Sequence, residues 1–493
     1  MVQGTASHVG KSVIATALCR VLREEGFSVA PFKAQNMSLN AAVTPDGSEI
    51  GRAQAAQADA AGILPRAEMN PILLKPEGEA RSQLVVMGRV AGSVAAREYW
   101  SRRSELWPVV AGALRELRRE HEVVVIEGAG SPAEVNLRHS DISNMRVARA
   151  ARAAVLLVGD IERGGVFAQL VGTLALLSPG DRARVRGLIV NKFRGDASLF
   201  DEGVRWLRRR SGLPVLGVLP YTDELGVPAE DSLSLDARGP ASATDSPDIA
   251  VLRYPRISNF DDFEPLAAAG ARVRYVRSAA TLGEPDLVVL PGSKSTIADL
   301  GWLRRSGLAG AVRALAARGV PVLGICGGYQ MLGRELVDAL GVEGAPSRVR
   351  GLGLLPVRTA FSREKRTVRV HGRITAGSQV APAGSPLGGY ELHTGDTRGA
   401  GTPPFASLVR EGTGETVSDG AVSADGAIVG TYVHGLFGDG AIVAGLLSRL
   451  AARRGIAFTP RPAPADRYAP LSAWFRGAID VPGLLALTGI RGG

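Results

Sequence analysis

Short apolar runs alternate with longer amphipathic segments along the first half of the chain. Four apolar runs, which we predict to be strands, span residues 123–126, 154–158, 187–190 and 215–219. Three amphipathic segments, which we predict to be helices, span residues 11–25, 104–120 and 199–211. Strands that are apolar throughout are buried on both faces, and helices cover both faces of a parallel sheet. The alternation therefore predicts a doubly wound α/β domain over residues 1–235.

The same alternation returns in the second half of the chain after a short polar stretch. Residues 236–248 read DARGPASATDSPD, a composition typical of a linker. Further apolar runs, which we predict to be strands, span residues 249–252, 287–290, 320–325 and 428–433. They predict a second doubly wound α/β domain over residues 249–455. Residues 340–425 are rich in Gly and Pro and give no assignment, and the tail at 456–493 has one predicted apolar helix near 471–488.

Charge and hydropathy argue against nucleic-acid binding and against a membrane span. The net charge is +10, but the basic residues are scattered and no aromatic residues interleave with them, so no nucleic acid is expected. No run of about 18 uncharged apolar residues occurs, so no membrane span is expected. An excess of cations also suits ATP and a substrate that carries several carboxylates.

The cysteines and the start of the chain indicate the compartment. Cys19 and Cys326 are the only cysteines, and two thiols this far apart indicate a reducing environment, the cytoplasm. A glycine-rich loop begins at residue 4, which leaves no room for a signal peptide. A strand that leads into such a loop usually has about five or six residues. We therefore expect either a start upstream of Met1 or a sheet that is thin at this strand.

The glycine-rich loop, GTASHVGKS, begins at Gly4 and runs directly into an amphipathic helix. Backbone N–H groups of such a loop and of the helix N-terminus form an anion site. Lys11 is placed to reach the β- and γ-phosphates of ATP, and the Ser12 hydroxyl to ligate Mg²⁺. The spacing departs from the usual phosphate loop, because Gly10 follows six residues after the first glycine and Thr5 occupies the usual first-glycine position. These five residues are the predicted nucleotide site.

This variant spacing resembles the dethiobiotin synthetase group of P-loop proteins, which activate a carboxylate with ATP. Two further positions resemble the same group. The segment VIEGAG ends a predicted strand at Glu127, and the resemblance implies that Glu127 ligates Mg²⁺. Asn191 closes the predicted strand at 187–190 and resembles the asparagine that recognises adenine in that group.

The most specific segment of the chain is VPVLGICGGYQ, which carries Cys326. The glycines permit the sharp strand-to-helix turn that holds a nucleophile out of a sheet. Cys326 then lies at a helix N-terminus, where the helix dipole lowers the pKa of a thiol. The N–H of Gly327 is placed to stabilise an oxyanion. We therefore predict that Cys326 is a nucleophile, whereas Cys19 on its amphipathic helix fits a buried structural residue.

A thiolate nucleophile needs a base, and His434 is the preferred candidate because it ends the predicted strand at 428–433. His393 is the rival candidate. The Cys elbow followed by a distal strand-end His resembles the class I glutamine amidotransferases, which implies a second oxyanion donor near Gly292. In many members an acidic residue two positions after the His orients it. Here that position is Leu436, so the third member of the triad is absent or supplied elsewhere.

Together the two halves resemble the cobyric acid synthases along nearly the whole chain. The motifs that carry this resemblance read FKAQNMSLN, EIGRAQ, MNP, LLKP, SPAEVNL, DIERGGVF, NKFRGD and PGSKST. The resemblance implies amidation of the b, d, e and g carboxylates of adenosylcobyrinic acid a,c-diamide, a corrinoid, with ATP, Mg²⁺ and glutamine in vitamin B12 biosynthesis. It places Lys33, Gln35, Asn36 and Asn40 in the synthetase site. Asp46 is a further candidate ligand for Mg²⁺.

Two other functions stay open at this stage. Cobyrinic acid a,c-diamide synthase shares both domains and differs in the carboxylates that it amidates, although the block KAQNMSLN disfavours it. The first half also resembles partitioning-type ATPase switches, which bind partners without making a product. A complete glutaminase built on Cys326 and His434 has no use in such a switch.

Overall fold

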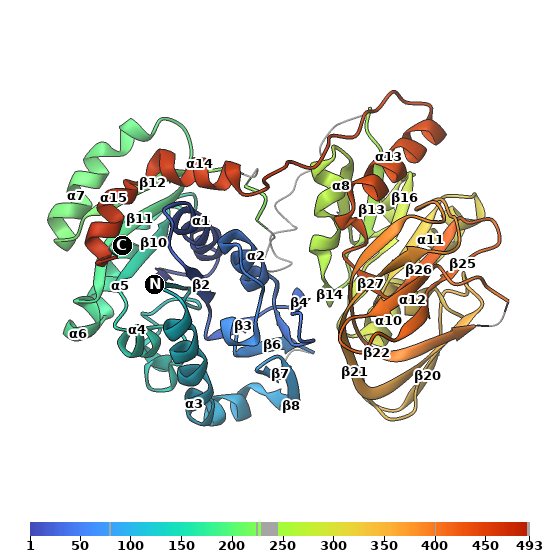
Figure 1. Ribbon diagram of the computed structural model, residues 1–493, viewed down its shortest axis with the longest axis horizontal. Helices are drawn as coiled ribbons and strands as arrows, with labels where there is room; N and C mark the ends of the chain where they lie inside the picture. The colour runs from blue at the N-terminus through green and yellow to red at the C-terminus, as the bar shows by residue number, and fades with distance from the viewer. Residues whose placement is uncertain (78–79, 223–224, 228–244, 400, 491–493) are drawn as a thin grey trace. The chain divides into compact units, whose positions relative to one another are not determined.

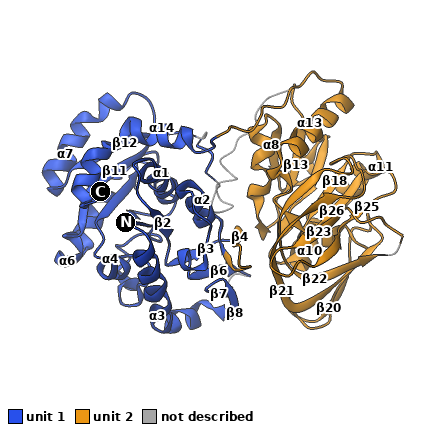
Figure 2. Ribbon diagram, in the orientation of Figure 1, with its two compact units in different colours: residues 1–38, 50–228, 466–493 blue, residues 39–49, 229–465 orange. Residues whose placement is uncertain are grey.

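The computed structural model describes residues 1–77, 80–222, 225–227, 245–399 and 401–490. The chain divides into two compact units, each built from separate stretches of the sequence (Figure 2). Unit 1 contains Met1–Ser38, Ile50–Pro228 and Asp466–Gly493, and unit 2 contains Leu39–Glu49 and Ala229–Ala465. The sequence predicted one division of the chain, at the linker, of which residues 236–244 lie outside the described residues. The two exchanged segments were not anticipated.

A parallel sheet forms the centre of unit 1, as the apolar runs predicted (Figure 1). Its strands β1 (Val2–Gly4), β10 (Val155–Asp160), β11 (Val185–Phe193) and β12 (Val215–Pro220) pair in that order. Strands β2 (Val29–Phe32) and β9 (Val123–Ile126) also pair in parallel, and a bridge between Val2 and Glu127 connects them to β1. The α/β prediction for this half is confirmed.

Helices cover both faces of this sheet because its strands are buried on both sides. Leu156 and Val158 pack with α1 (Lys11–Glu24) and the C-terminal helices α14 (Ala469–Ala478) and α15 (Val481–Thr488). Val155 and Leu157 pack on the opposite side. The helices of that opposite side are α4 (Met145–Ala151), α5 (Val166–Leu176) and α7 (Asp201–Ser211). The remaining helices of unit 1 are α2 (Arg52–Ala61), α3 (Ala96–Glu120) and α6 (Pro179–Arg182).

A small mixed sheet extends unit 1 beside the loop that follows β2. It contains β3 (Gln35–Met37), β6 (Ile72–Pro76), β7 (Arg81–Val86) and β8 (Arg89–Ala95), of which β3 and β6 are parallel. None of these four strands was predicted from the sequence.

The C-terminal segment of unit 1 forms two helices where the sequence analysis expected one near 471–488. They are α14 (Ala469–Ala478) and α15 (Val481–Thr488). The Asp480 side chain caps the second helix by accepting a hydrogen bond from Gly483 N at 3.1 Å. Pro482 follows in the first turn, where its missing N–H does no harm. These two residues end one helix and begin the next, so the single-helix prediction is wrong.

Unit 2 contains a second parallel sheet, which confirms the α/β prediction for the second half. Its strand order is β15 (Arg272–Val276), β13 (Asp248–Leu252), β16 (Leu287–Leu290), β18 (Val322–Ile325), β26 (Ile428–Thr431) and the antiparallel β25 (Ala421–Val422). Its helices are α8 (Glu264–Ala268), α9 (Ala279–Leu282), α10 (Thr296–Arg305), α11 (Leu308–Ala317), α12 (Gly327–Leu332) and α13 (Gly440–Arg454). The predicted strand at 428–433 ends earlier, at Thr431.

The unassigned residues 340–425 belong mostly to a second, largely antiparallel sheet. It contains β19 (Glu335–Asp338), β20 (Ser347–Arg350), β21 (Val357–Ile374), β22 (Pro386–Gly399), β23 (Ala406–Arg410), β24 (Thr416–Asp419) and β27 (Val433–His434). One short pair, β14 (Ile257–Ser258) with β17 (Gly292–Ser293), completes unit 2. The short strands β4 (Ala41–Val43) and β5 (Glu49–Gly51) also pair. No helix among the described residues is long and apolar enough to cross a membrane.

Candidate functional sites

Cys326 lies between β18 and α12 in a strained backbone conformation, with φ 53° and ψ −112°. Residues other than glycine rarely adopt positive φ, and such strain is concentrated at functional sites. The glycines make this turn possible. A Cβ atom at Gly328 would lie 1.9 Å from the Leu290 carbonyl oxygen, and one at Gly324 would lie 2.8 Å from the carbonyl carbon of Gly328. The strand-turn-helix arrangement expected around Cys326 is therefore present.

One ring nitrogen of His434 is hydrogen-bonded to a carboxylate. Its Nδ1 lies 2.7 Å from Oδ2 of Asp262, which also accepts a hydrogen bond from Gly435 N at 2.9 Å through Oδ1. Asp262 lies in a short 3₁₀ turn at Phe260–Phe263 and is buried. It supplies the orienting carboxylate that the sequence lacked at Leu436, and it fixes Nδ1 as the protonated nitrogen, leaving Nε2 for chemistry.

The surroundings of His434 favour the protonated ring. Burial by itself would lower the pKa of His434, but the Asp262 carboxylate and the adjacent Cys326 side chain outweigh burial and raise the pKa to about 10. A cationic imidazole beside a thiol favours the thiolate, which is the reactive form of cysteine. The pair can thus act as a nucleophile and a proton donor to a leaving group.

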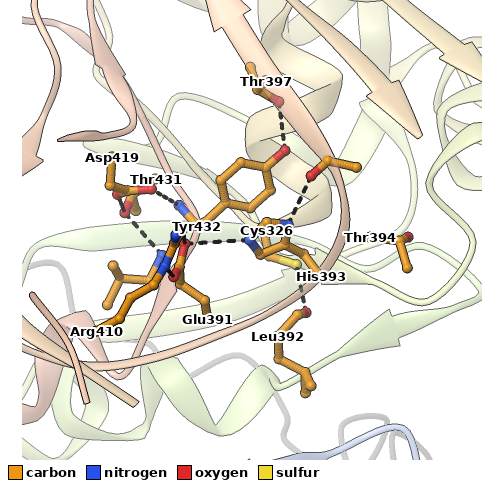
Figure 3. A network of polar contacts seen from close by, with 12 residues as sticks. Cys326, Glu391, Leu392, His393, Thr394, Thr397, Arg410, Asp419, Thr431 and Tyr432 are labelled. Atoms are coloured by element: carbon orange, nitrogen blue, oxygen red, sulfur yellow. Dashed lines mark hydrogen bonds and ion pairs between the residues drawn. The ribbon is translucent and has the colours of Figure 1, made fainter. Parts of the chain in front are cut away.

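His393, the alternative base, lies in a different setting on β22 (Figure 3). Its ring stacks on Tyr432 with centroids 3.7 Å apart, its Nδ1 lies 3.0 Å from Gly395 O, and its Nε2 lies 3.5 Å from Glu391. Cys326 is among the groups that raise the pKa of His434. The geometry favours His434 as the base.

The two predicted oxyanion positions lie next to the reactive pair. A Cβ atom at Gly292 would lie 3.0 Å from Cε1 of His434, and one at Gly327 would lie 3.0 Å from the Ser293 backbone nitrogen. Gly292 therefore lies close to the imidazole, and Gly327 lies close to the residue that follows Gly292. This proximity is compatible with two backbone N–H groups that stabilise one oxyanion.

A buried polar network extends from the Cys326 thiol into the antiparallel sheet (Figure 3). The thiol donates to the Leu392 carbonyl at 3.5 Å. Beside Leu392, burial would raise the pKa of Glu391, but hydrogen bonds from His393 and Arg410 outweigh it and lower the pKa to about 2. Arg410 Nε donates to Glu391 at 2.7 Å. These contacts hold β22 firmly at the position where it meets the thiol.

In unit 1 the glycine-rich loop lies between β1 and α1. Gly10 has φ 100°, and a Cβ atom there would lie 2.0 Å from Nδ2 of Asn191, so only glycine fits. Lys11 donates to Ala6 O at 2.9 Å and to Gly130 O at 3.1 Å, which places its ammonium within the loop. Asn191 donates to Val9 O at 2.9 Å. The structure thus brings Asn191 to the loop, and its role in nucleotide binding stays a prediction.

Gly4 and Thr5 form the first part of the same loop. A Cβ atom at Gly4 would lie 2.4 Å from a methyl carbon of Val9, which explains a glycine at this position. The Thr5 backbone N–H donates to Val158 O at 2.9 Å, and its hydroxyl donates to Gln169 at 3.1 Å. These bonds fix the entry of the loop to the central sheet.

Glu127 gathers three donors at the end of β9. The Ser12 hydroxyl lies 2.8 Å from Oε1 of Glu127, Lys33 lies 2.8 Å from the same oxygen, and Gln57 donates to Oε2 at 2.7 Å. Ser12 and Glu127 offer two hard oxygen donors side by side. Mg²⁺ in nucleotide sites usually takes one or two protein oxygens and completes its shell with phosphate and water. The pair fits that ion, although the described residues contain no cluster of three or more acidic, His or Cys groups.

The other predicted synthetase residues separate into two groups. Gln35 accepts a hydrogen bond from the Tyr99 hydroxyl at 2.6 Å, and Asn36 donates to Gln54 at 2.9 Å, both within unit 1. Asn40 belongs to unit 2, where its Oδ1 accepts from Phe260 N at 3.3 Å.

Asp46 also belongs to unit 2 and lies in the turn between β4 and β5. Its carboxylate accepts from the Thr44 hydroxyl and, at 2.9 Å, from the Ser48 hydroxyl. Burial would raise the pKa of Asp46, but these hydrogen bonds outweigh it and lower the pKa. The contacts explain Asp46 as a turn residue, and its role as a metal ligand stays a prediction.

Asp262 and Gln57 were not predicted from the sequence. Asp262 lies 172 positions before His434, so no local spacing connects the two. The only available signal was the segment NFDDF, in which acidic residues stand between aromatic residues that a core would bury. Buried carboxylates are rare unless they have a partner.

Comparison with known proteins covers nearly the whole chain. A model of the CobQ/CobB/MinD/ParA nucleotide binding domain matches residues 1–234, and a model of the CobB/CobQ-like glutamine amidotransferase domain matches residues 248–442. The chain is 53% identical to a cobyric acid synthase of Sorangium cellulosum, covering 92% of this chain and 91% of that protein. It is 50% identical to a probable cobyric acid synthase of Methanocella arvoryzae, covering 99% and 97%, and 49% identical to a cobyric acid synthase of Desulforudis audaxviator, covering 99% of both.

Proposed function

The chain belongs to the cobyric acid synthase family, and we propose that it amidates the b, d, e and g carboxylates of adenosylcobyrinic acid a,c-diamide with ATP and glutamine. The arrangement that carries this proposal is Cys326, with its strained backbone, beside the Asp262-bound imidazole of His434, in one chain with a phosphate loop. The first centre releases ammonia from glutamine. The second activates the acceptor carboxylate.

In the glutaminase reaction, the Cys326 thiolate attacks the side-chain amide carbon of glutamine. The negative charge that develops on the amide oxygen is stabilised by backbone N–H groups at Gly292 and Gly327. The C–N bond then breaks as His434 passes its Nε2 proton to the leaving nitrogen. Water hydrolyses the thioester, which yields glutamate and regenerates the thiol.

In the synthetase reaction, a substrate carboxylate takes the γ-phosphoryl group of ATP, and ammonia then displaces phosphate from the acyl phosphate. Lys11 and the loop N–H groups offset the charge of the phosphates, and Lys33 lies within the same group of side chains as Ser12 and Glu127. Mg²⁺, held by Ser12 and Glu127, would supply further positive charge at the phosphates.

The decisive experiment uses Cys326→Ala. We expect glutamine-supported amidation of the diamide to fall to background, while a high concentration of ammonium supports amidation at close to the wild-type rate. Mass spectrometry of the corrinoid product counts the amides added. Wild-type protein that adds no amide to the diamide with either nitrogen source would refute the proposal, and addition of two amides to cobyrinic acid alone would indicate the a,c-diamide synthase reaction.

A further inference from the structure

The segment Leu39–Glu49 belongs to the glutaminase unit although it lies within the N-terminal part of the sequence. Its residues Asn40 and Ala41 are completely buried. A buried backbone carbonyl requires a hydrogen-bond donor. The donors to such a carbonyl show which side chains the segment holds in place. The partners of Ala41 lie beside His434.

The carbonyl oxygen of Ala41 accepts two hydrogen bonds, and a third hydrogen bond joins the two donors. Asn259 Nδ2 donates to Ala41 O at 2.8 Å, and the Tyr390 hydroxyl donates to the same oxygen at 3.0 Å. Asn259 Nδ2 also donates to the Tyr390 hydroxyl at 2.7 Å. Both side chains are buried, so water cannot easily replace a lost bond.

Tyr390 holds one face of the His434 ring. The two residues are opposite each other in the antiparallel pairing of β22 with β27. Their rings stack with centroids 5.3 Å apart and planes inclined by 22°. The hydroxyl bond to Ala41 therefore fixes the ring that supports the imidazole.

Asn259 holds the turn that presents Asp262. It has φ 52°, in the left-handed region, and its carbonyl accepts a hydrogen bond from Asp262 N at 3.2 Å. The same turn is tied at Phe260, whose N–H donates to Asn40 Oδ1 at 3.3 Å. Asp262, at the end of the turn, holds Nδ1 of His434.

We propose that Ala41, through Tyr390 and Asn259, positions His434 for its reaction with Cys326, so that residues 39–49 form part of the glutaminase centre. The inference rests on the proposed function, because positioning has meaning only if Cys326 and His434 hydrolyse glutamine. Tyr390 and Asn259 are positioning residues that act through His434 and Asp262. Small displacements of a catalytic group are costly, about a hundredfold for an error of about 1 Å.

Tyr390→Phe removes the hydroxyl hydrogen bond to Ala41 O and keeps an aromatic ring stacked on His434. We expect kcat for glutamine hydrolysis to fall about tenfold, with little change in KM for glutamine, because a buried hydrogen bond is lost away from the substrate. Ammonium-supported amidation is expected to stay at the wild-type rate. The alkaline limb of the kcat/KM profile is expected to move to lower pH, because a displaced His434 retains its proton less firmly.

Asn259→Gly removes the side-chain hydrogen bond from residue 259 to Ala41 O. Glycine tolerates the positive φ of this position, so the backbone conformation of the turn can be kept. We expect a similar loss of kcat. The double variant is expected to lose less than the product of the two single effects, because both residues act through the same carbonyl. Tyr468→Phe is the matched control. It removes a buried tyrosine hydroxyl bond to a backbone carbonyl, Ala56 O at 3.0 Å, in unit 1, and it should leave kcat for glutamine hydrolysis unchanged.

Wild-type kcat and an unmoved pH profile in both Tyr390→Phe and Asn259→Gly would overturn the inference. Equal losses of glutamine- and ammonium-supported activity, accompanied by a lower Tm, would also overturn it, because that result describes general destabilisation. A wild-type protein that fails to use glutamine at all would instead refute the proposed function.

Discussion

Asp262 is the carboxylate that holds the His434 ring, and it is distant from His434 in the sequence. Its two carboxylate oxygens accept from the His434 ring and from Gly435 N, so the imidazole is held at a defined tautomer and angle. Many relatives of the wider amidotransferase class place an acidic residue two positions after the His. Here the hydrophobic Leu436 is buried at that position, and the carboxylate comes from another element.

We expect Asp262→Asn to lower kcat for glutamine hydrolysis by at least about a hundredfold, because an amide cannot enforce the tautomer that leaves Nε2 reactive. The substitution should also return the pKa of His434 from about 10 toward its ordinary value. Because the native pKa is raised, protonation of His434 stabilises the fold fully below about pH 6.5 and this contribution is lost as the pH rises through about 10.

Chemical unfolding at several pH values should therefore show the largest stability difference between wild type and Asp262→Asn below about pH 6.5, with the difference shrinking as the pH approaches 10. Asp261→Asn, which changes the adjacent carboxylate, is the control for both measurements. A pH-independent stability difference would contradict the role given to the Asp262–His434 pair.

Lys11→Ala is expected to abolish both glutamine-supported and ammonium-supported amidation, because the acyl phosphate cannot form without the lysine of the phosphate loop. Glutamine hydrolysis assayed by glutamate release should continue, since Cys326 and His434 lie in the other unit. Full ammonium-driven amidation in this variant would refute the role assigned to Lys11. Unchanged thermal unfolding of the variant is the necessary control.

At the level of elements, the C-terminal helices complete the core of unit 1. Leu471 and Phe475 of α14 and Leu484 of α15 are buried in the same cluster as the apolar face of α1. The contact with the sheet is close, since a Cβ atom at Gly217 in β12 would lie 2.1 Å from Ala478 O. These helices therefore support the helix that follows the phosphate loop.

Phe475→Ala should reduce the free energy of unfolding of unit 1 by about 3–5 kcal/mol, the cost of removing a fully buried aromatic ring. Urea unfolding followed by circular dichroism measures the change, and the transition of unit 1 should move while that of unit 2 stays. Ala473→Ser, at an exposed position of the same helix, is the control. A loss below about 1 kcal/mol would show that the helix packs only loosely.

At the scale of the whole molecule, the two units share the sequence in an interleaved order. Unit 2 takes Leu39–Glu49 from the N-terminal part, and unit 1 takes Asp466–Gly493 from the C-terminus. The ion pair of Lys365 with Glu49, 2.5 Å between Nζ and Oε2, ties the borrowed segment to β21. A single cut near the predicted linker therefore leaves neither unit complete.

Separate expression of residues 1–234 and 248–493 should give two fragments that are less stable than the corresponding units of the intact chain. Fragment 248–493 lacks the Ala41 carbonyl, so its glutamine hydrolysis should be lower than that of the intact chain. Co-expression of the two fragments should restore part of the activity, as measured by glutamate release. Full glutaminase activity in the isolated second fragment would contradict a catalytic contribution from residues 39–49.

The sequence by itself determined the α/β class of both halves, the phosphate loop and the Cys326 elbow. Each of these features is set by residues that are close together in the sequence, because apolar periodicity, glycine spacing and a strand-to-helix turn are local properties. The sequence also preferred His434, which ends a recognisable strand. It did not resolve residues 340–425, since long strands with many polar positions and glycines give a weak apolar signal.

Only the tertiary structure decided which distant residues meet. Asp262 reaches His434 within the fold of unit 2, whereas Ala41 reaches Tyr390 and the C-terminal helices reach α1 because the chain crosses between the units more than once. Such pairings are selected by the packing of complete sheets, and the free energy of a buried contact does not depend on how far apart its partners lie in the sequence. For that reason the local chemistry could be predicted, whereas the third triad residue and the unit boundaries could not.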